Sequence, residues 1–296
     1  MTAPSIQNVL AQRYASSDMR HLWSTENKVV LERRLWIALL RAQRSLGIAV
    51  PDQAVGAYEA VVDKVDLVSI RARERVTRHD VKARIEEFCA LAGYEEIHKG
   101  MTSRDLTENV EQMQVRDSLL LVRDRMVASL ARLSELAVQH ATTVLTGRTH
   151  NVPAQAITLG KRFANAGEEL LHAFDRVEQM CVDYPLRGMK GPVGTQQDQL
   201  DLLNGDREKV AKLEAAIAKH LGFKQILTNV GQVYPRSLDF EVVSSLLMAI
   251  SGPSNLATTI RLMAGQELLT EGFKPGQVGS SAMPHKMNTR SCERIN

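Results

Sequence analysis

The feature that most constrains the fold of this chain is a long stretch without glycine or proline. After Met101, neither residue occurs until Gly147, so no strong helix breaker interrupts this part of the backbone. At a rise of about 1.5 Å per residue, a helix of about forty residues is a rod of roughly 60 Å. Such a rod needs neighbours along its length, which predicts a bundle of long helices or a coiled coil.

Other segments show the spacing of apolar residues that is typical of helices. Residues 24–46 and 80–92 have this spacing and are followed by Gly47 and Gly93, which favour helix ends. Thr102, with a carboxylate three residues later, predicts a capped helix start. Further helices are expected over residues 153–185, 206–221 and 237–269, the last with a kink at Gly252-Pro253, and a short strand over 224–233.

Length and composition agree with a helical chain. With 296 residues, the chain can bury a sizeable core, and its length suggests about two domains. Hydrophobic residues make up 44% and aromatic residues only 4%, so the core depends on aliphatic side chains and methionine, which favours helices. We expect an all-α chain with an N-terminal helical domain over residues 1–105 and a long-helix bundle over 106–296.

Charge and cysteine content set further bounds. The 37 basic and 34 acidic residues nearly balance, which does not argue for nucleic-acid binding but leaves a local phosphate pocket open. Cys89, Cys181 and Cys292 lack the spacing of metal or redox motifs, which predicts a reduced, cytoplasmic compartment. We expect no secretory signal and no membrane span, because the sequence has neither a signal-like N-terminus nor a long apolar run.

Ten residues that begin at Gly279 have the composition of a catalytic loop. Gly279 and the small hydroxyl residues Ser280 and Ser281 allow the backbone to approach a ligand closely. Lys286 and Asn288 add a cation and an amide donor, which suit an anionic substrate and the stabilisation of developing negative charge. The alternative interpretation is a polar surface loop.

Two more polar segments flank the predicted long helix. Gly147, the Thr149-His150 pair and Pro153 predict a rigid turn that holds an imidazole at a helix end, although His150 could also be a capping or surface histidine. At the other end, a histidine and two hydroxyls lie where unpaired backbone N–H groups favour a carboxylate, and a simple helix cap is the alternative. These three residues are His98, Thr102 and Ser103.

The loop that begins at Gly279 resembles the signature of the fumarase/aspartase superfamily, Gly-Ser-Ser-x-Met-Pro-x-Lys-x-Asn-Pro. Thr289 replaces the final proline, a change that affects how the loop exits rather than its donors. His285 is the version typical of adenylosuccinate lyases and carboxymuconate cycloisomerases. Members of the superfamily eliminate fumarate or close relatives from substituted succinates, and the resemblance implies their long-helix bundle.

The resemblance also implies roles for the other polar residues. The Thr149-His150 pair resembles the motif whose histidine acts in proton transfer, and Glu293 matches the carboxylate that pairs with this histidine. The alternative for Glu293 is a solvated carboxylate. The segment from His98 resembles His-x-Gly-x-Thr-Ser-x-Asp, whose Thr-Ser pair, here Thr102 and Ser103, binds the succinyl carboxylates.

Other residues point within the superfamily to the adenylosuccinate lyase family. Arg13 and Tyr14 resemble the pair that contacts the nucleotide phosphate, and His79 resembles a second active-site histidine. Gln232 and Arg236 lie where the family places polar residues that contact the substrate. The N-terminal pattern continues at Met19, Trp23, Ser24, Lys28 and Glu32.

The chemistry of this family requires these residue types. Elimination of fumarate from a succinyl-amine needs a base, for which the resemblance implies Ser280, and a general acid for the leaving amine, for which it implies His150. Lys286, Asn288 and backbone N–H groups are expected to stabilise the aci-carboxylate intermediate. The expected reactions convert adenylosuccinate to AMP and cleave the succinyl-carboxamide ribotide intermediate of purine synthesis. No metal or organic cofactor is needed, and the sequence contains no metal-ligand spacing.

The resemblance further implies a homotetramer around a shared helical core, with each site built from several subunits. Because the chain stops eight residues after Asn288, we also expect it to be a fragment that lacks the rest of the bundle and a C-terminal domain.

Two alternatives remain open. The chain could be a relative of argininosuccinate lyase or carboxymuconate cycloisomerase, which the Arg13-Tyr14 pair disfavours and a substrate panel would distinguish. It could also be a non-catalytic helical scaffold. The joint presence of His150, Ser280 and Lys286 with Asn288 argues against a scaffold.

Overall fold

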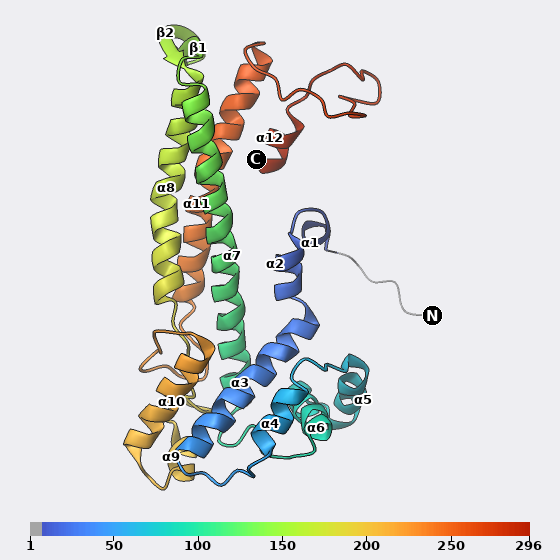
Figure 1. The fold of residues 1–296 in the computed structure, drawn as a ribbon, viewed down its shortest axis with the longest axis vertical. Coiled ribbons are helices and arrows are strands. Elements are labelled where there is room, and N and C mark those ends of the chain that lie inside the picture. Colours follow the sequence, from blue (N-terminus) through green and yellow to red (C-terminus); the bar gives the residue numbers. More distant parts are fainter. Residues whose placement is uncertain (1–7) are drawn as a thin grey trace. The chain divides into compact units, whose positions relative to one another are not determined.

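The computed structural model describes residues 8–296, and its regular secondary structure is mostly helical (Figure 1). The prediction of an all-α chain is confirmed, with one β-hairpin in addition. In chain order, the elements are α1 (Val9–Arg13), α2 (Ser17–Leu22), α3 (Thr25–Ser45), α4 (Ala54–Ala60), α5 (Leu67–Thr77), α6 (Asp80–Ala92), α7 (Ser103–Gln139), β1 (Val144–Thr149), β2 (Val152–Thr158), α8 (Leu159–Asp183), α9 (Gln197–Leu202), α10 (Arg207–Leu221), α11 (Ser237–Gly265) and α12 (Arg290–Ile295).

The chain forms two compact units. The first unit consists of the chain up to Leu121 together with Cys181–Leu238, and the second consists of Val122–Met180 and Asp239–Asn296. The long helices α7, α8 and α11 therefore each contribute residues to both units. The predicted domain division near residue 105 falls at the start of α7 and stays a prediction.

The core of the first unit is built on α3. The helix begins after Ser24, whose Oγ accepts a hydrogen bond from the backbone N–H of Asn27 at 3.1 Å, and this cap stabilises the first turn. Trp36 is fully buried and stacks on Phe88 of α6, with ring centroids 6.1 Å apart. Tyr58 of α4 packs against the same ring, so one aromatic cluster joins three helices.

Three predicted helices of this unit form with nearly the expected bounds. Helix α3 lies within residues 24–46, and α6 spans residues 80–92. Helix α10 begins after Asp206, which caps it, and ends before Gly222. Gly93 and Gly222 both have φ +77°, in the left-handed region that favours glycine at a helix end.

The long helix α7 starts where the sequence predicts. The backbone N–H of Thr102 donates to Asp105 Oδ2 at 2.9 Å, which confirms the predicted cap. The helix has 37 residues and ends at Gln139 rather than near Gly147. A β-hairpin occupies the interval that the sequence assigned to the ends of two helices.

The hairpin corrects the expected surroundings of His150. Strands β1 and β2 are antiparallel, and His150 and Asn151 form the turn between them with φ values of +50° and +62°. Two consecutive residues with positive φ are typical of a tight hairpin turn. The imidazole is therefore in a strand connection and not at a helix end. Pro153 lies in β2 rather than at the start of a helix, and α8 begins only at Leu159.

The strand expected over residues 224–233 does not form. Among the described residues of this segment, Ile226 makes a single isolated bridge with Leu186. Two backbone hydrogen bonds flank this bridge, from Leu186 N to Gln225 O and from Leu227 N to Leu186 O, and a single bridge does not make a strand.

The second unit is a bundle in which α8 and α11 run side by side with part of α7 (Figure 1). A Cβ at Gly252 would lie 3.3 Å from Ala166 O and from Leu170 N, so glycine at this position allows α11 to approach α8 closely. Helix α11 continues through Pro253 and ends at Gly265, four residues before the predicted end. None of the described helices is both long enough and apolar enough to span a membrane.

Candidate active site

The first unit contains a polar pocket of about 560 Å³ at the start of α6 and α7. It brings together His79 and Ser103, two of the predicted site residues. Lys28 and Arg104 contribute positive charge, and two helix starts add partial positive charge from their N–H groups. The remaining lining residues are Trp23, Asp80, Val81, Thr107, Glu111 and Gln114.

His79 is held in place by the helix that it starts. It is the N-cap of α6, and its Nδ1 accepts a hydrogen bond from the backbone N–H of Lys82 at 3.3 Å. When the ring is neutral, its proton therefore resides on Nε2. The imidazole can then offer an N–H donor to an anion in the pocket.

His98 has a different environment. Its Nδ1 accepts a hydrogen bond from Trp36 Nε1 at 3.0 Å, and its backbone has a positive φ of +67°. Burial lowers the pKa of His98 to about 4, although the negative charge of Asp105 opposes this shift. His98 is therefore neutral at physiological pH, with its remaining N–H on Nε2, and serves as a hydrogen-bond donor rather than a cation.

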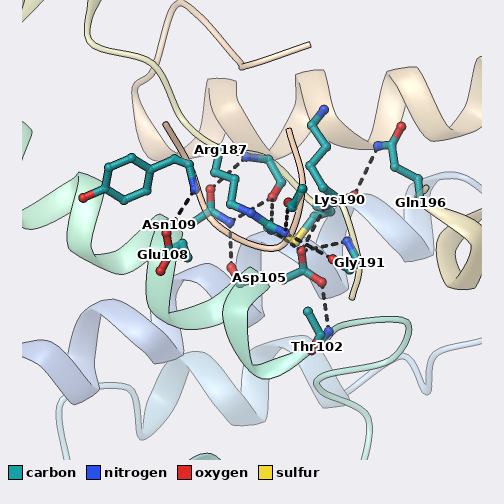
Figure 2. A network of polar contacts seen from close by, with 12 residues as sticks. Thr102, Asp105, Glu108, Asn109, Arg187, Lys190, Gly191 and Gln196 are labelled. Atoms are coloured by element: carbon teal, nitrogen blue, oxygen red, sulfur yellow. Dashed lines mark hydrogen bonds and ion pairs between the residues drawn. The ribbon is translucent and has the colours of Figure 1, made fainter. Parts of the chain in front are cut away.

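A buried polar network fixes the segment that carries Thr102 and Ser103 (Figure 2). Arg187 and Asp105 are both completely buried, with 2.5 Å between Arg187 Nη1 and Asp105 Oδ1. The same Oδ1 accepts the backbone N–H groups of Lys190 and Gly191, each at 3.0 Å. Because Oδ2 accepts from Thr102, one carboxylate ties the start of α7 to the loop after α8.

Arg187 extends this network to the segment that carries Gln232. Its Nη2 donates to Gly191 O at 3.1 Å and to Gly231 O at 2.9 Å. The side chain of Gln232 itself is exposed. Two loops that are distant in the sequence are thus attached to the same guanidinium group.

A second buried carboxylate connects Arg236 to α7. Glu108 Oε1 lies 3.1 Å from Arg104 Nη1 and 3.2 Å from Arg236 Nη2. The backbone N–H of Tyr234 donates to Glu108 Oε2 at 3.1 Å, and the guanidinium of Arg236 stacks over the Tyr234 ring. Arg236 therefore shares a carboxylate with Arg104, a residue that lines the pocket.

The predicted phosphate-binding pair lies elsewhere in this unit. Arg13 is the last residue of α1, Tyr14 follows it, and both side chains are exposed. Neither residue lines the pocket around His79.

In the second unit, the loop over residues 279–288, here called the signature loop, closes on itself. The Gly279 N–H donates to Pro284 O at 2.8 Å, and Asn288 Nδ2 donates to Gly279 O at 2.8 Å. Ser280 Oγ is half-buried and accepts the backbone N–H of Met283 at 2.8 Å, whereas Ser281 is exposed. The loop thus presents the two serines differently although they are adjacent.

A pocket of about 600 Å³ adjoins the signature loop and brings together three predicted residues, Lys286, Asn288 and Glu293. Arg261 of α11 also lines it. The carboxylate of Glu293 lies 3.8 Å from Arg290 Nε. The structure does not bring His150 to this pocket, and Figure 1 shows the hairpin well apart from α12. The pairing of His150 with Glu293 stays a proposal.

The exit of the loop shows how the chain accommodates Thr289 in place of the family proline. Thr289 is buried and precedes α12, but its side chain does not cap that helix. The cap comes instead from Glu271, which accepts the backbone N–H groups of Ser291 and Cys292, each at 3.1 Å. Burial opposes ionisation of Glu271, but hydrogen bonds from Cys292 and Ser291 outweigh it and lower the pKa of this carboxyl.

We expect Gly279→Ala to open the signature loop. A Cβ at this position would lie 1.6 Å from Lys286 O, a distance that requires the backbone to move. Trypsin cleavage after Lys286 measures the change, and it should be several-fold faster in the variant. Gly265→Ala is the matched control, because a Cβ there meets nothing within 4 Å. Equal cleavage rates in Gly279→Ala and the unmodified chain would contradict this account of the loop.

Sequence reasoning missed the residues that organise the first unit. Arg187 is an isolated arginine between Pro185 and Gly188, and nothing in its local sequence indicates burial. Asp105 was recognised as part of a helix cap and as the last residue of the His-x-Gly-x-Thr-Ser-x-Asp motif, but not as a buried ion-pair partner, and Glu108 had no assigned role. A helical period of three to four residues places Asp105 and Glu108 on one face of α7. This shared face was the one sequence signal that could have pointed to these two carboxylates.

The comparisons with known proteins agree with the fold and the motifs. A family model described as "Lyase" matches residues 11–296. The chain therefore belongs to this lyase family, and its expected membership of the fumarase/aspartase superfamily is confirmed. A 3-carboxy-cis,cis-muconate lactonizing enzyme from Pseudomonas putida has a similar fold, with a TM-score of 0.81 and 23% identity over 97% of this chain and 64% of the other. A fumarate lyase from Mesorhizobium has a TM-score of 0.74 with 23% identity, over 95% of this chain and 62% of the other.

Curated relatives match over nearly the whole chain. An adenylosuccinate lyase from Saccharomyces cerevisiae is 36% identical over 293 residues, which cover 97% of this chain and 60% of the relative. An adenylosuccinate lyase from Schistosoma mansoni is 35% identical over 292 residues, which cover 97% of this chain and 61% of the relative. The chain thus spans about three fifths of the length of these relatives.

Proposed function

We propose that this chain belongs to an enzyme that eliminates fumarate from adenylosuccinate to give AMP, and from the succinyl-carboxamide ribotide intermediate of purine synthesis. The observation that carries the proposal is the signature loop, with Ser280, Lys286 and Asn288, in a chain whose curated relatives are named adenylosuccinate lyases. The pocket around His79 and Ser103 supports it by offering positive charge and N–H donors to an anion.

The proposed mechanism gives each of the predicted residues a role. In the second unit, Ser280 removes the proton beside a carboxylate, and Lys286 with Asn288 stabilises the resulting aci-carboxylate. His150, assisted by Glu293, protonates the leaving amine. In the first unit, His98, Thr102 and Ser103 hold the succinyl carboxylates, and His79 assists catalysis. Further substrate contacts come from Arg13 and Tyr14 to the phosphate, and from Gln232, Arg236 and Ser281.

We further propose a homotetramer in which each site draws on several subunits. A row of exposed apolar side chains on α11 supports an interface there, because such rows are uncommon on surfaces that face water. These residues follow a helical spacing and are Phe240, Val243, Leu247 and Ile250. A cytoplasmic location is part of the same proposal.

A substrate panel tests the choice within the superfamily. The protein should release fumarate from adenylosuccinate and not from argininosuccinate, and it should not cyclise carboxymuconate. Cleavage of argininosuccinate without cleavage of adenylosuccinate would replace this proposal with the argininosuccinate lyase alternative. Activity on none of the three, both by this chain when folded and by the full gene product to which it belongs, would favour the scaffold alternative.

A further inference from the structure

Beneath the pocket around His79 lies a buried carboxylate to which the proposed reaction assigns no role. Glu32 of α3 is completely buried and follows Lys28, which lines the pocket, by one helical turn. Its Oε1 has no hydrogen-bond donor among the residues that the structure describes. A buried carboxylate that is only partly paired is costly to keep ionised, so this position is an unusual one for a structural glutamate.

Arg84 connects Glu32 to the wall of the pocket. Arg84 Nε lies 2.6 Å from Glu32 Oε2, and Arg84 Nη2 lies 2.9 Å from Asp80 Oδ2. Asp80 Oδ1 in turn lies 3.6 Å from His79 Nδ1, and both of these residues line the pocket. A chain of charged groups thus leads from the interior to the pocket.

The charges around Glu32 nearly cancel when it is ionised. The groups that face it are Arg84 and Asp80 from α6 and Lys28 from its own helix. Burial raises the pKa of Glu32 to about 7, while Arg84 and Lys28 oppose this shift. Two cations and two carboxylates are balanced above this pH, and protonation of Glu32 leaves one positive charge in excess.

We propose that Glu32 and Arg84 set the charge of this pocket, so that protonation of Glu32 strengthens the binding of a dianionic group there. The inference rests on the proposed function only in taking the pocket as a site for a substrate phosphate or carboxylate. By linkage, an anion in the pocket must favour the protonated form of Glu32 to the same extent.

Sulfate binding tests the proposal without any need for turnover, because sulfate stays a dianion across the pH range. The chain has two tryptophans, of which Trp36 is buried and Trp23 lines the pocket. In a chain labelled with ¹⁵N-tryptophan, Trp23→Phe identifies the Trp23 indole signal, which then reports sulfate binding. Sulfate affinity should fall as the pH rises from about 6 to about 8. The factor by which it falls should be about fivefold larger in the unmodified chain than in Glu32→Gln.

The comparison of two variants separates the contribution of Glu32 from that of the other groups that line the pocket, among them His79. Glu26→Gln, an exposed change on the same helix, should keep the pH dependence of the unmodified chain. The same pH dependence in Glu32→Gln and the unmodified chain would overturn the proposal, as would a Trp23 signal that sulfate does not shift at either pH. If Glu32→Gln does not fold, the pH dependence of sulfate affinity is measured in His79→Asn instead. Affinity that still falls as the pH rises through about 7 supports a role for Glu32, and constant affinity overturns it.

This design also separates the proposal from the proposed function. A chain that shows the sulfate effect but releases no fumarate would keep the role of Glu32 and count against the lyase reaction. A chain that releases fumarate but shows no such sulfate effect would support the lyase reaction and overturn the role of Glu32.

Discussion

Arg187→Met is expected to lower the free energy of unfolding of this protein by about 3–5 kcal/mol, because it leaves a fully buried carboxylate without its cation. Methionine retains much of the apolar volume of the arginine stem, so the loss reports mainly on charge and hydrogen bonding. Asp105 would lose its ion pair, and the carbonyl groups of Gly191 and Gly231 would lose their donors. Urea unfolding followed by circular dichroism measures the change.

An exposed arginine provides the control for this experiment. Arg44 pairs with Asp52 on the surface of the same unit, so Arg44→Met should change the stability by less than about 0.5 kcal/mol. The double variant Arg187→Met, Asp105→Leu should recover part of the loss, because it removes the unpaired charge. A loss below about 1 kcal/mol for Arg187→Met would mean that the network does not hold the first unit together.

Ser280→Ala is expected to slow fumarate release by about two to four orders of magnitude, the usual contribution of a positioned acid or base. The fold should be unaffected, since Ser280 Oγ is the acceptor of one local hydrogen bond from Met283. Initial rates with saturating adenylosuccinate measure the effect, and circular dichroism checks the fold. Ser251→Ala on α11 removes a comparable local hydrogen bond, to Leu247 O, and should leave the rate within about twofold. A Ser280→Ala variant with an unchanged rate would show that another group is the base.

Much of the helical fold could be predicted from local sequence signals. The caps at Ser24 and Asp206 and the glycines at 93 and 222 act through the residues next to them, so their effect can be recognised without the tertiary structure. The hairpin over residues 144–158 was missed because its turn is made by His150 and Asn151 rather than by glycine. Pro153 within the second strand also suggested a helix start, since proline is common at that position.

The candidate site could be predicted only in part. The motifs identified His79 and Ser103, and the structure brings these two residues to one pocket. The ion pair of Arg187 with Asp105 and the position of Glu32 beneath the pocket depend on contacts between distant segments, for which a single sequence carries no signal. The same limit applies to His150 and Glu293, whose expected pairing rests on the resemblance alone.

The most direct test of the central claim is to incubate this protein with adenylosuccinate and to quantify AMP and fumarate together by NMR. We expect both products to accumulate in equal amounts and neither to form with Ser280→Ala. If neither product forms with a folded chain, nor with the full gene product to which it belongs, the claim that this protein eliminates fumarate from adenylosuccinate is contradicted.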